Sequence, residues 1–487
     1  MFRVGIALLA VSVAAVAHGD GDILTWPRFR GPNGSGVADR QRPPIEVGPE
    51  KNVKWKIAVP AGLSSPIVAG DLLVLTAFDE EKLWTIAYNR ADGREVWRAE
   101  SPVQRLEAYH QPDGSPAAST PTTDGERIVS YFGSCGLVCH DLLGKELWRY
   151  ELPTVETMGS FGTGVSPVIE EGVVLLLRDA GSDSKLIALD LATGKLKWEK
   201  PRTSRGGFST PVIWETPEGK QVVAAGHGRL IGYDLANGDE KWFVDGMPTS
   251  CCASPVTADG NLYFAAWSPG AAGDKSFQLP PFKLLLLADG DGDGLIGRNE
   301  LAKSPLHNFF DTIDADKDGG ITQQEWETTS AFMAASKNSA FAVRPGGKGD
   351  VTATHVKWLR TNGLPYVPSS MVYDGQHLMV KDGGIVTAYD AQTGDEIFQK
   401  RAVASGGYYA SPVAANGYVY FTSLSDGVIT VLKSGATTPA VAVKNLPLGE
   451  RVSATPAIAD DTLYVRTAGH MYAFCEEDAA ALEKLPK

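Results

Sequence analysis

The chain has 487 residues, of which 43% are hydrophobic and 21% charged, and its formal net charge is −13 at pH 7. Because it is acidic and contains no run of Lys or Arg, we expect no nucleic-acid partner and no binding to an anionic membrane surface. The 53 glycines and 30 prolines favour a turn-rich, all-β fold.

The N-terminal residues 1–19 predict a secretory signal peptide. Arg3 precedes an apolar run over residues 4–16, and small residues favour cleavage after Ala17 or Gly19. No cysteine stands at this site, so we expect no lipid anchor, and no later apolar run approaches the roughly 20 residues that a membrane-spanning helix needs. The mature protein is therefore expected to be exported, to the periplasm or outside the cell.

Residues 20–50 follow as a predicted N-terminal strap. Its segment 26–36 is rich in turn residues and has neither helical nor strand periodicity. We expect Trp26 and Phe29 to pack on the main domain. The alternative is that this segment is a peptide that docks on another protein.

One short unit recurs along most of the chain and is most complete at residues 188–198, Ala-Leu-Asp-Leu-Ala-Thr-Gly-Lys-Leu-Lys-Trp. Asp190 can accept backbone N–H groups across a tight turn and Gly194 tolerates a positive φ, so the unit predicts a hairpin that ends on a buried Trp. Degraded copies end at Trp55, Trp97, Trp148, Trp242, Trp358 and Phe398.

A second marker is Ser or Thr followed by Pro at the start of a strand. It occurs at residues 65–66, 120–121, 166–167, 210–211, 254–255, 411–412 and 455–456, with Ser370 and Met371 as a degenerate copy. Successive copies are 41 to 55 residues apart, except for a step of 116 residues before Met371. Repeats of about 40 to 50 residues are typical of propeller blades. We therefore predict an all-β, eight-bladed β-propeller with a small α-helical insertion, in which the Trp55 segment supplies the outer strand of the last blade.

The unit at 188–198 resembles the repeat of pyrroloquinoline-quinone (PQQ)-type β-propellers, Ala-x-Asp-x-x-Thr-Gly-Lys-x-x-Trp, and the resemblance extends over residues 50–475 outside the insertion. Similar repeats occur in quinoprotein dehydrogenases and in the propeller lipoprotein of outer-membrane β-barrel assembly, which is not an enzyme. The resemblance thus implies the fold and leaves two kinds of function open.

The long step between repeats marks an insertion, which we place at residues 271–349, between propeller segments 51–270 and 350–477 and before a C-terminal tail at 478–487. It contains two EF-hand patterns, Asp-x-Asp-x-Asp-Gly-x-Ile-x-x-x-Glu, at 289–300 and 314–325. This spacing supplies carboxylates at positions 1, 3 and 5, a backbone carbonyl at 7 and a bidentate Glu at 12, which together suit Ca²⁺. The predicted ligands of two Ca²⁺ ions are Asp289, Asp291, Asp293, Leu295, Glu300, Asp314, Asp316, Asp318, Gly320 and Glu325.

Helices are expected to flank these loops, a short one at residues 282–288 and a longer one at 323–337, and those between the loops must be short. We interpret the calcium as a structural support, because clustered carboxylates repel one another without a cation. The alternative, a calcium sensor, would need a hydrophobic groove that opens on binding, and the short helices offer little apolar surface for one.

The segments before the eight strand openings cross from the outside of one blade to the inside of the next, so we expect them to gather at one mouth of the central channel. They carry Tyr109, His110, Phe161, Arg205, Phe208, Cys251, Cys252, Tyr366, Tyr408, Tyr409 and Arg451. These residues predict a funnel for a planar or anionic ligand, with Cys251, Cys252, Arg205 and Arg451 as candidate ligand-binding or cofactor-binding residues. The alternative is that the aromatic side chains simply pack between blades.

Two functions remain as hypotheses. We favour an exported calcium-binding propeller that binds a protein or polymer partner without catalysis. The second is a PQQ-dependent oxidoreductase similar to alcohol dehydrogenases, in which the resemblance implies that the adjacent Cys251 and Cys252 face the cofactor. The Glu, Asn and Asp of a catalytic calcium site are not recognisable, nor is a nucleophile elbow, a His-Glu-x-x-His motif or a haem attachment site, so no catalytic residue is assigned.

Overall fold

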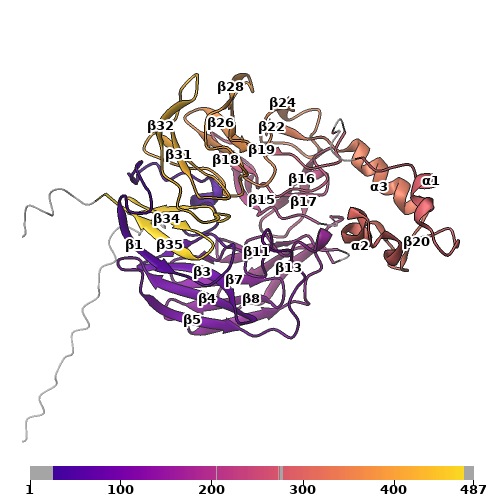
Figure 1. Cartoon of the computed structure of the whole chain (residues 1–487), viewed down its shortest axis with the longest axis horizontal. Helices are drawn as coiled ribbons and strands as arrows, with labels where there is room; N and C mark the ends of the chain where they lie inside the picture. The colour runs from indigo at the N-terminus through magenta and orange to yellow at the C-terminus, as the bar shows by residue number, and fades with distance from the viewer. Residues whose placement is uncertain (1–25, 182, 205, 273, 275–277, 477–487) are drawn as a thin grey trace, which may run out of the picture.

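Eight antiparallel sheets surround a central channel in the computed structural model, which describes residues 26–181, 183–204, 206–272, 274 and 278–476 (Figure 1). Seven sheets have four strands, and the sheet of blade 4 has a fifth. The first strands of adjacent blades contact one another, so they line the channel. The predicted eight-bladed β-propeller is confirmed.

The blades are numbered in chain order, and each is given from its innermost strand outward. Blades 1 and 2 are β2 (Ile67–Ala69), β3 (Leu72–Asp79), β4 (Lys82–Asn89) and β5 (Glu95–Ser101), then β6 (Thr122–Thr123), β7 (Arg127–Phe132), β8 (Gly136–Asp141) and β9 (Glu146–Glu151). Blades 3 and 4 are β10 (Val168–Glu170), β11 (Val173–Arg178), β12 (Lys185–Asp190) and β13 (Leu196–Pro201), then β14 (Val212–Thr216), β15 (Gly219–Gly226), β16 (Arg229–Asp234), β17 (Glu240–Asp245) and the parallel strand β23 (Gly349–Asp350).

Blades 5 and 6 are β18 (Val256–Ala258), β19 (Asn261–Ala266), β22 (Ser339–Val343) and β24 (Val356–Arg360), then β25 (Met371–Tyr373), β26 (Gln376–Lys381), β27 (Ile385–Asp390) and β28 (Glu396–Arg401). Blades 7 and 8 are β29 (Val413–Ala415), β30 (Tyr418–Thr422), β31 (Ile429–Lys433) and β32 (Ala440–Lys444), then β33 (Ala457–Ala459), β34 (Thr462–Arg466), β35 (His470–Phe474) and β1 (Val53–Ala58).

Strand β1 closes the ring, as predicted for the Trp55 segment. It pairs antiparallel with β35, so that Trp55 lies opposite Ala473, and the first and last colours of the chain meet in blade 8 of Figure 1. Because blade 8 combines both ends of the chain, the ring has no unpaired blade at which another sheet could add.

In five units the Trp at the end packs on the turn glycine of the next blade, whereas Trp242 lies against Gly232 of its own blade. Trp148 donates its indole N–H to the carbonyl of Leu191 at 2.8 Å. Gly194 has φ 67°, and a Cβ at this position would lie only 2.6 Å from the Trp148 ring. The glycine is therefore required both for the turn and for the close approach of the Trp. The same contact joins Trp55 to Gly93, Trp97 to Gly144, Trp198 to Gly238 and Trp358 to Gly394.

The Ser or Thr before each strand opening belongs to a closed ring of hydrogen bonds. The backbone N–H of each donates to the side-chain oxygen of the equivalent residue in the next blade, at 2.9 to 3.1 Å. The members in order are Ser65, Thr120, Ser166, Thr210, Ser254, Ser369, Ser411 and Thr455. In blade 6 the member is Ser369, so Ser370 and not Met371 holds the proline position. The expectation was one residue off there, because two serines precede the strand.

The strap crosses the channel end opposite the crossing segments. Trp26 is fully buried, as expected, and residues 32–34 form a short 3-10 helix, η1 (Pro32–Gly34). The strap contacts every blade, through Trp26 to Val68, Pro27 to Thr123, Arg28 to Glu170, Asn33 to Ile213 and Thr257, Arg30 to Ser370, Val37 to Ala414 and Arg42 to Asp461. One end of the channel is therefore covered by the protein itself.

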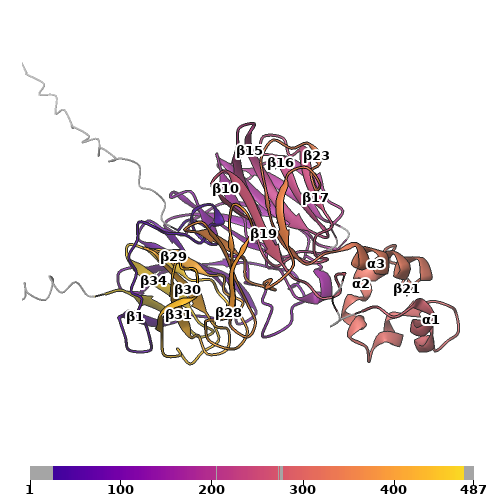
Figure 2. The same ribbon diagram turned by 90° about the horizontal axis from the view of Figure 1, so that it is seen from above.

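The insertion leaves blade 5 between β19 and β22 and projects from the rim of the ring (Figures 1 and 2). It contains α1 (Phe282–Leu285), η3 (Leu286–Ala288), β20 (Ile296–Gly297), η4 (Arg298–Leu301), η5 (Pro305–Phe309), α2 (Phe310–Ile313), β21 (Gly320–Ile321) and α3 (Gln323–Ala335). The expected helices at 282–288 and 323–337 are present. Strand β22 lies inside the range 271–349 expected for the insertion, which therefore ends before Ser339. β22 pairs with β19 and β24 and so completes blade 5.

The insertion has its own small core and docks on the propeller. Its core gathers Phe282, Ile296, Phe310, Ile321 and Trp326, and the last donates its indole N–H to the carbonyl of Pro280 at 2.8 Å. On the propeller side, the Phe332 ring stacks on His227 with ring centroids 4.0 Å apart, and Lys317 lies 3.5 Å from Glu156. No helix in the described part of the chain combines the length and the apolar character needed to cross a membrane.

Candidate functional site

The crossing segments of blades 1 to 5 meet through a row of aromatic contacts. The His110 and Phe161 rings have centroids 5.5 Å apart, and the Phe161 and Phe208 rings 6.5 Å apart. The backbone N–H of Phe208 then donates to the carbonyl of Cys251 at 2.9 Å. Residues far apart in the sequence are thus brought into one arc, as the funnel prediction requires.

The remaining crossing segments continue this arc. The Arg451 guanidinium lies 5.2 Å from the centre of the Tyr409 ring and donates to Asp113 at 2.5 Å. Asp113 belongs to the same crossing segment as His110, so this pair links blade 8 to blades 1 and 2. Burial, together with smaller contributions from the nearby Cys252 and Tyr409, raises the pKa of Tyr366 to about 12. We call this set, His110, Asp113, Phe161, Phe208, Cys251, Cys252, Tyr366, Tyr409 and Arg451, the mouth.

Two of the predicted funnel residues, Tyr408 and Tyr109, differ in position from the others. Tyr408 is 1% exposed and donates its hydroxyl to the carbonyl of Ala404, so it packs between blades, as the alternative held. Tyr109 is half-buried edge-on against Phe78. Arg205 lies outside the described residues. That a ligand binds at the mouth remains a prediction.

Cys251 and Cys252 are both thiols at the mouth. Cys251 is fully buried, and burial raises its pKa; burial also raises the pKa of Cys252 to about 12. Both groups are therefore held in the neutral thiol form near pH 7, which lowers their reactivity as nucleophiles.

Several polar residues near the mouth escaped the sequence analysis. Asp113 is 338 positions from its partner Arg451, and Arg202 forms a buried bidentate pair with Asp179 at 2.7 and 3.1 Å. Glu107 is 2% exposed and accepts a hydrogen bond from Thr163 at 2.6 Å. No local pattern marks such residues, because their partners come from other blades.

Two acidic clusters in the insertion could hold metal ions. Carboxylate oxygens of Asp289, Asp291 and Asp293 lie within 4.8 Å of one another, as do oxygens of Asp314, Asp316 and Glu325. Strands β20 and β21 pair Ile296 with Ile321 and so hold the two loops side by side. In both loops the residue at position 12 also binds backbone N–H groups at the loop start: Glu300 accepts from Gly290 at 2.5 Å and Glu325 from Ala315 at 2.6 Å.

The second cluster contains an unused buried acceptor. Asp314 is 3% exposed, and its Oδ1 atom receives no hydrogen bond from the described residues. Burial raises the pKa of Asp314, and the neighbouring carboxylates of Glu325 and Asp318 raise it further. A cation between these oxygens would satisfy the unused acceptor and remove the repulsion, so the donor set fits a hard divalent ion.

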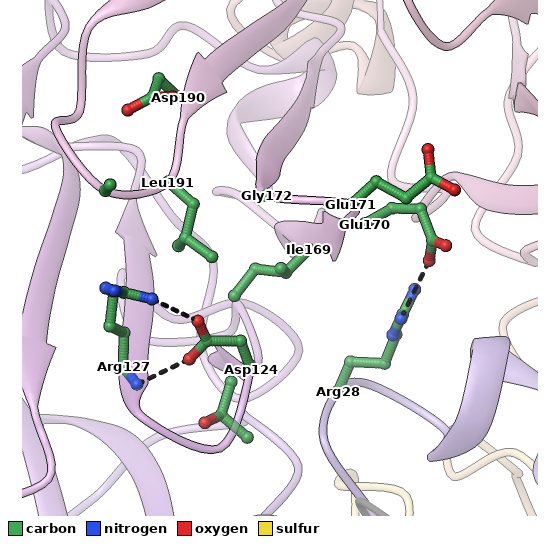
Figure 3. Close-up of a pocket in the computed structure, with 11 residues that line it drawn as sticks. Arg28, Asp124, Arg127, Ile169, Glu170, Glu171, Gly172, Asp190 and Leu191 are labelled. Atoms are coloured by element: carbon green, nitrogen blue, oxygen red, sulfur yellow. Dashed lines mark hydrogen bonds and ion pairs between the residues drawn. The ribbon is translucent and has the colours of Figure 1, made fainter.

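A separate pocket lies between blades 2 and 3 on the strap side of the ring (Figure 3). Its volume is about 390 Å³, and most of the charged groups in its wall are paired with one another. Arg28 lies 3.6 Å from Glu170, and Arg127 donates to Asp124 at 2.6 Å. Because these charges are already compensated, the pocket offers a ligand few unpaired groups.

The ring of eight blades and the repeated Trp–Gly contact define a class of protein, the eight-bladed β-propellers built from PQQ-type repeats. The family model described as outer membrane protein assembly factor BamB (PQQ_2) matches residues 47–154, 82–245 and 314–483, which together are more than half of the chain. The chain belongs to this family.

One relative and two solved structures are similar to the chain. An outer membrane protein assembly factor BamB from Nitrosomonas eutropha is 29% identical over 206 residues, which are 39% of this chain and 44% of that protein, so less than half of the relative is matched. The crystal structure of BamB from Moraxella catarrhalis has a TM-score of 0.54 at 12% identity, over 87% of this chain and 97% of that one. The computationally designed Ika8 protein has a TM-score of 0.53 at 11% identity, over 86% and 98%. At such identities the structural likeness shows the fold alone.

Proposed function

We propose that the protein is an exported, calcium-binding propeller that acts as a scaffold and binds a protein or polymer partner at the mouth. The observation that carries the proposal is the difference between the two channel ends. The strap covers one end, whereas the other displays the mouth, where Phe161 and Tyr366 are each 38% exposed. Aromatic and Arg side chains are enriched at the centres of protein interfaces. The name of the Nitrosomonas relative, an assembly factor of the outer membrane, supports a protein partner in the periplasm.

Substitution at the mouth tests this proposal. Arg451→Ala removes the bond to Asp113 and the contact with Tyr409, so we expect at least about a tenfold loss of partner binding, which corresponds to about 1.4 kcal/mol. Binding is measured by retention of periplasmic proteins on the immobilised chain, with the retained proteins identified and quantified by mass spectrometry. Arg40→Ala, an exposed substitution on the strap, is the control and should bind like the unchanged protein. If the unmodified protein, Arg451→Ala and Arg40→Ala all retain the same amount of each periplasmic protein, the mouth is not a partner site.

Calcium binding by the insertion is the second part of the proposal. It is supported by the two acidic clusters, by the unused Oδ1 of Asp314 and by the pairing of the two loops through β20 and β21. The ion would supply the positive charge that these loops lack and hold their carboxylates together. We infer a structural role, since the helical segments between the loops have five residues or fewer and Trp326 is already buried in the core of the insertion.

Calorimetric titration of the chelator-treated protein with CaCl₂ is expected to show two bound ions per chain. The combined Glu300→Gln and Glu325→Gln substitutions should abolish the heat of calcium binding, because each substitution removes the charged bidentate ligand of one loop. The melting transition of the propeller should change little in this variant, since the insertion has a separate core. Glu327→Gln, on the exposed side of α3, is the control and should keep both sites. Unfolding of the whole double variant would show that the insertion is integral to the ring.

A PQQ-dependent oxidoreductase is the second candidate, favoured by the adjacent cysteines at the mouth. Incubation with the quinone and Ca²⁺, followed by a visible absorption spectrum and a dye-linked alcohol oxidation assay, separates the two functions. The scaffold proposal expects neither quinone absorption after gel filtration nor dye reduction, and the oxidoreductase expects both.

A further inference from the structure

Two arginines of the strap border a small cavity inside the channel. The cavity lies between the strap and the inner strands of blades 3 to 5, and its volume is about 10 Å³. Such a volume holds about one water-sized particle. Its wall includes Arg28, Arg30, Asn33, Thr210 and Ser254. None of the residues of the mouth lines this cavity.

Arg30 is a buried cation that has no carboxylate partner among the described residues. It is fully buried, and its Nη2 donates to the carbonyl of Ser370 at 2.6 Å and to that of Ser35 at 3.4 Å. Its Nε and Nη1 atoms are buried and find no acceptor among the described residues. Burial lowers the pKa of Arg30 to about 9, the direction expected of a cation that lacks a neighbouring negative charge. An uncompensated buried charge is costly unless a counterion accompanies it.

A second buried arginine, Arg466, has more acceptors than Arg30, although its Nε also finds none among the described residues. Arg466 is 1% exposed, and its two terminal nitrogens donate to the carbonyls of Ser64, Thr76 and Pro60 and to the Ser64 hydroxyl at 2.7 to 3.0 Å. Arg30 has no such set of acceptors.

Arg28 is the second arginine in the wall of this cavity. Its Nη2 lies 3.6 Å from Glu170, but its Nε is buried and has no acceptor among the described residues. Asn33 contributes no acceptor, because its side-chain oxygen accepts from the N–H of Ile213 and its NH₂ donates to Ile213 and Thr257. Three guanidinium nitrogens of two residues in the cavity wall are therefore left without an acceptor.

We propose that this cavity binds one monatomic anion of the size of chloride, held by the N–H groups of Arg28 and Arg30. The volume excludes sulfate, phosphate and organic anions, and the unused groups are all donors, which select a negatively charged ligand. The anion neutralises the charge that the strap carries into the channel. It thereby fixes the segment that contacts all eight blades.

Bromide substitutes for chloride in anion sites, and its position in a crystal is identified from its anomalous scattering. Crystals of the unmodified protein soaked in NaBr are expected to show a bromine peak within hydrogen-bonding distance of Arg30 Nε or Nη1. The absence of an anomalous peak in this cavity, with density for a water molecule alone, would overturn the proposal.

Thermal unfolding tests the same site in solution. In NaCl the melting temperature should rise by about 2 °C or more over that in sodium gluconate at equal ionic strength and should saturate with concentration, because gluconate is too large to enter. Arg30→Gln should lose this difference, and the exposed control Arg40→Gln should keep it. A chloride effect that persists in Arg30→Gln, or that is absent from the unmodified protein, would contradict the proposal. If Arg30→Gln fails to fold, the bromide experiment decides the question.

Discussion

Truncation of the chain after Asp461 is expected to abolish the folded state. The truncation removes β34 and β35, so β1 loses the strand with which it pairs and blade 8 keeps only β33 and β1, which do not pair with each other. It also removes Arg466, whose guanidinium binds the carbonyls of Ser64 and Thr76 in blade 1. Blades 1 and 7 would then expose to water the apolar surfaces that now pack against blade 8. Circular dichroism should show no cooperative melting, and the product should aggregate.

A second truncation provides the control for this experiment. A chain that ends at Glu476 keeps every described strand, including the β1–β35 pair, and should melt like the full protein. If the chain that ends at Asp461 is soluble and melts cooperatively, closure of the ring by the two ends of the chain does not hold the propeller together.

The repeated unit made the fold predictable, because its residues serve local and inter-blade contacts at once. Gly194 is recognisable from its turn, and the same residue admits the Trp148 ring from the preceding blade. Likewise, the Ser or Thr before each strand opening marks a blade in the sequence and joins the ring of hydrogen bonds in the structure. Blade count and closure could therefore be read from spacing alone.

The contents of the channel could not be predicted in this way. Arg30 binds Ser370, 340 positions away, and Arg451 binds Asp113, 338 positions away, so no spacing within a repeat indicates either contact. The strap has no periodicity, so the confirmed prediction from its sequence is limited to the burial of Trp26. Tyr408 shows the limit for aromatic residues, since it shares its Gly-rich segment with Tyr409 but packs between blades.

The insertion was predictable where its pattern is strict and less so at its boundaries. The loops at 289–300 and 314–325 have fixed positions for carboxylates, and both bring three acidic side chains together. The end of the insertion was placed too late, because a strand as short as β22 carries no motif of its own.

Glu107 in the crossing segment between blades 1 and 2 is expected to make the stability of the protein depend on pH. Its side chain is 2% exposed and contacts Thr163 of the next crossing segment, and its Oε1 has no hydrogen-bond partner among the described residues. Burial raises the pKa of Glu107 from 4.5 to about 7, although the hydrogen bond from Thr163 and the charge of Arg178 oppose the shift. The folded state therefore keeps this proton at pH values where the unfolded chain has lost it.

The sign of the effect follows from this difference in protonation. Below about pH 4.5 both states hold the proton, and between about pH 4.5 and 7 only the folded state does, so the free energy of unfolding falls as the pH rises through this range. Above about pH 7 the carboxyl group is ionised in both the folded and the unfolded state. The free energy of unfolding has by then fallen by about 3 kcal/mol in total, as expected for a pKa shift of this size. Glu107→Gln removes the titration.

Denaturant unfolding of Glu107→Gln and of the unmodified protein at pH 5 and pH 8 measures this effect. The Gln amide places an N–H group where Oε1 lacks a partner, which costs about 1 to 3 kcal/mol at either pH. This cost is the same at both pH values, so a change with pH comes from the carboxyl group alone. The free energy of unfolding of the variant minus that of the unmodified protein should be about 2 to 3 kcal/mol higher at pH 8 than at pH 5. Glu126→Gln, an exposed change in the turn between β6 and β7 of blade 2, should show no such dependence. A stability difference that is equal at both pH values for Glu107→Gln would mean that the buried carboxyl is already ionised at pH 5, with Arg178 compensating its charge.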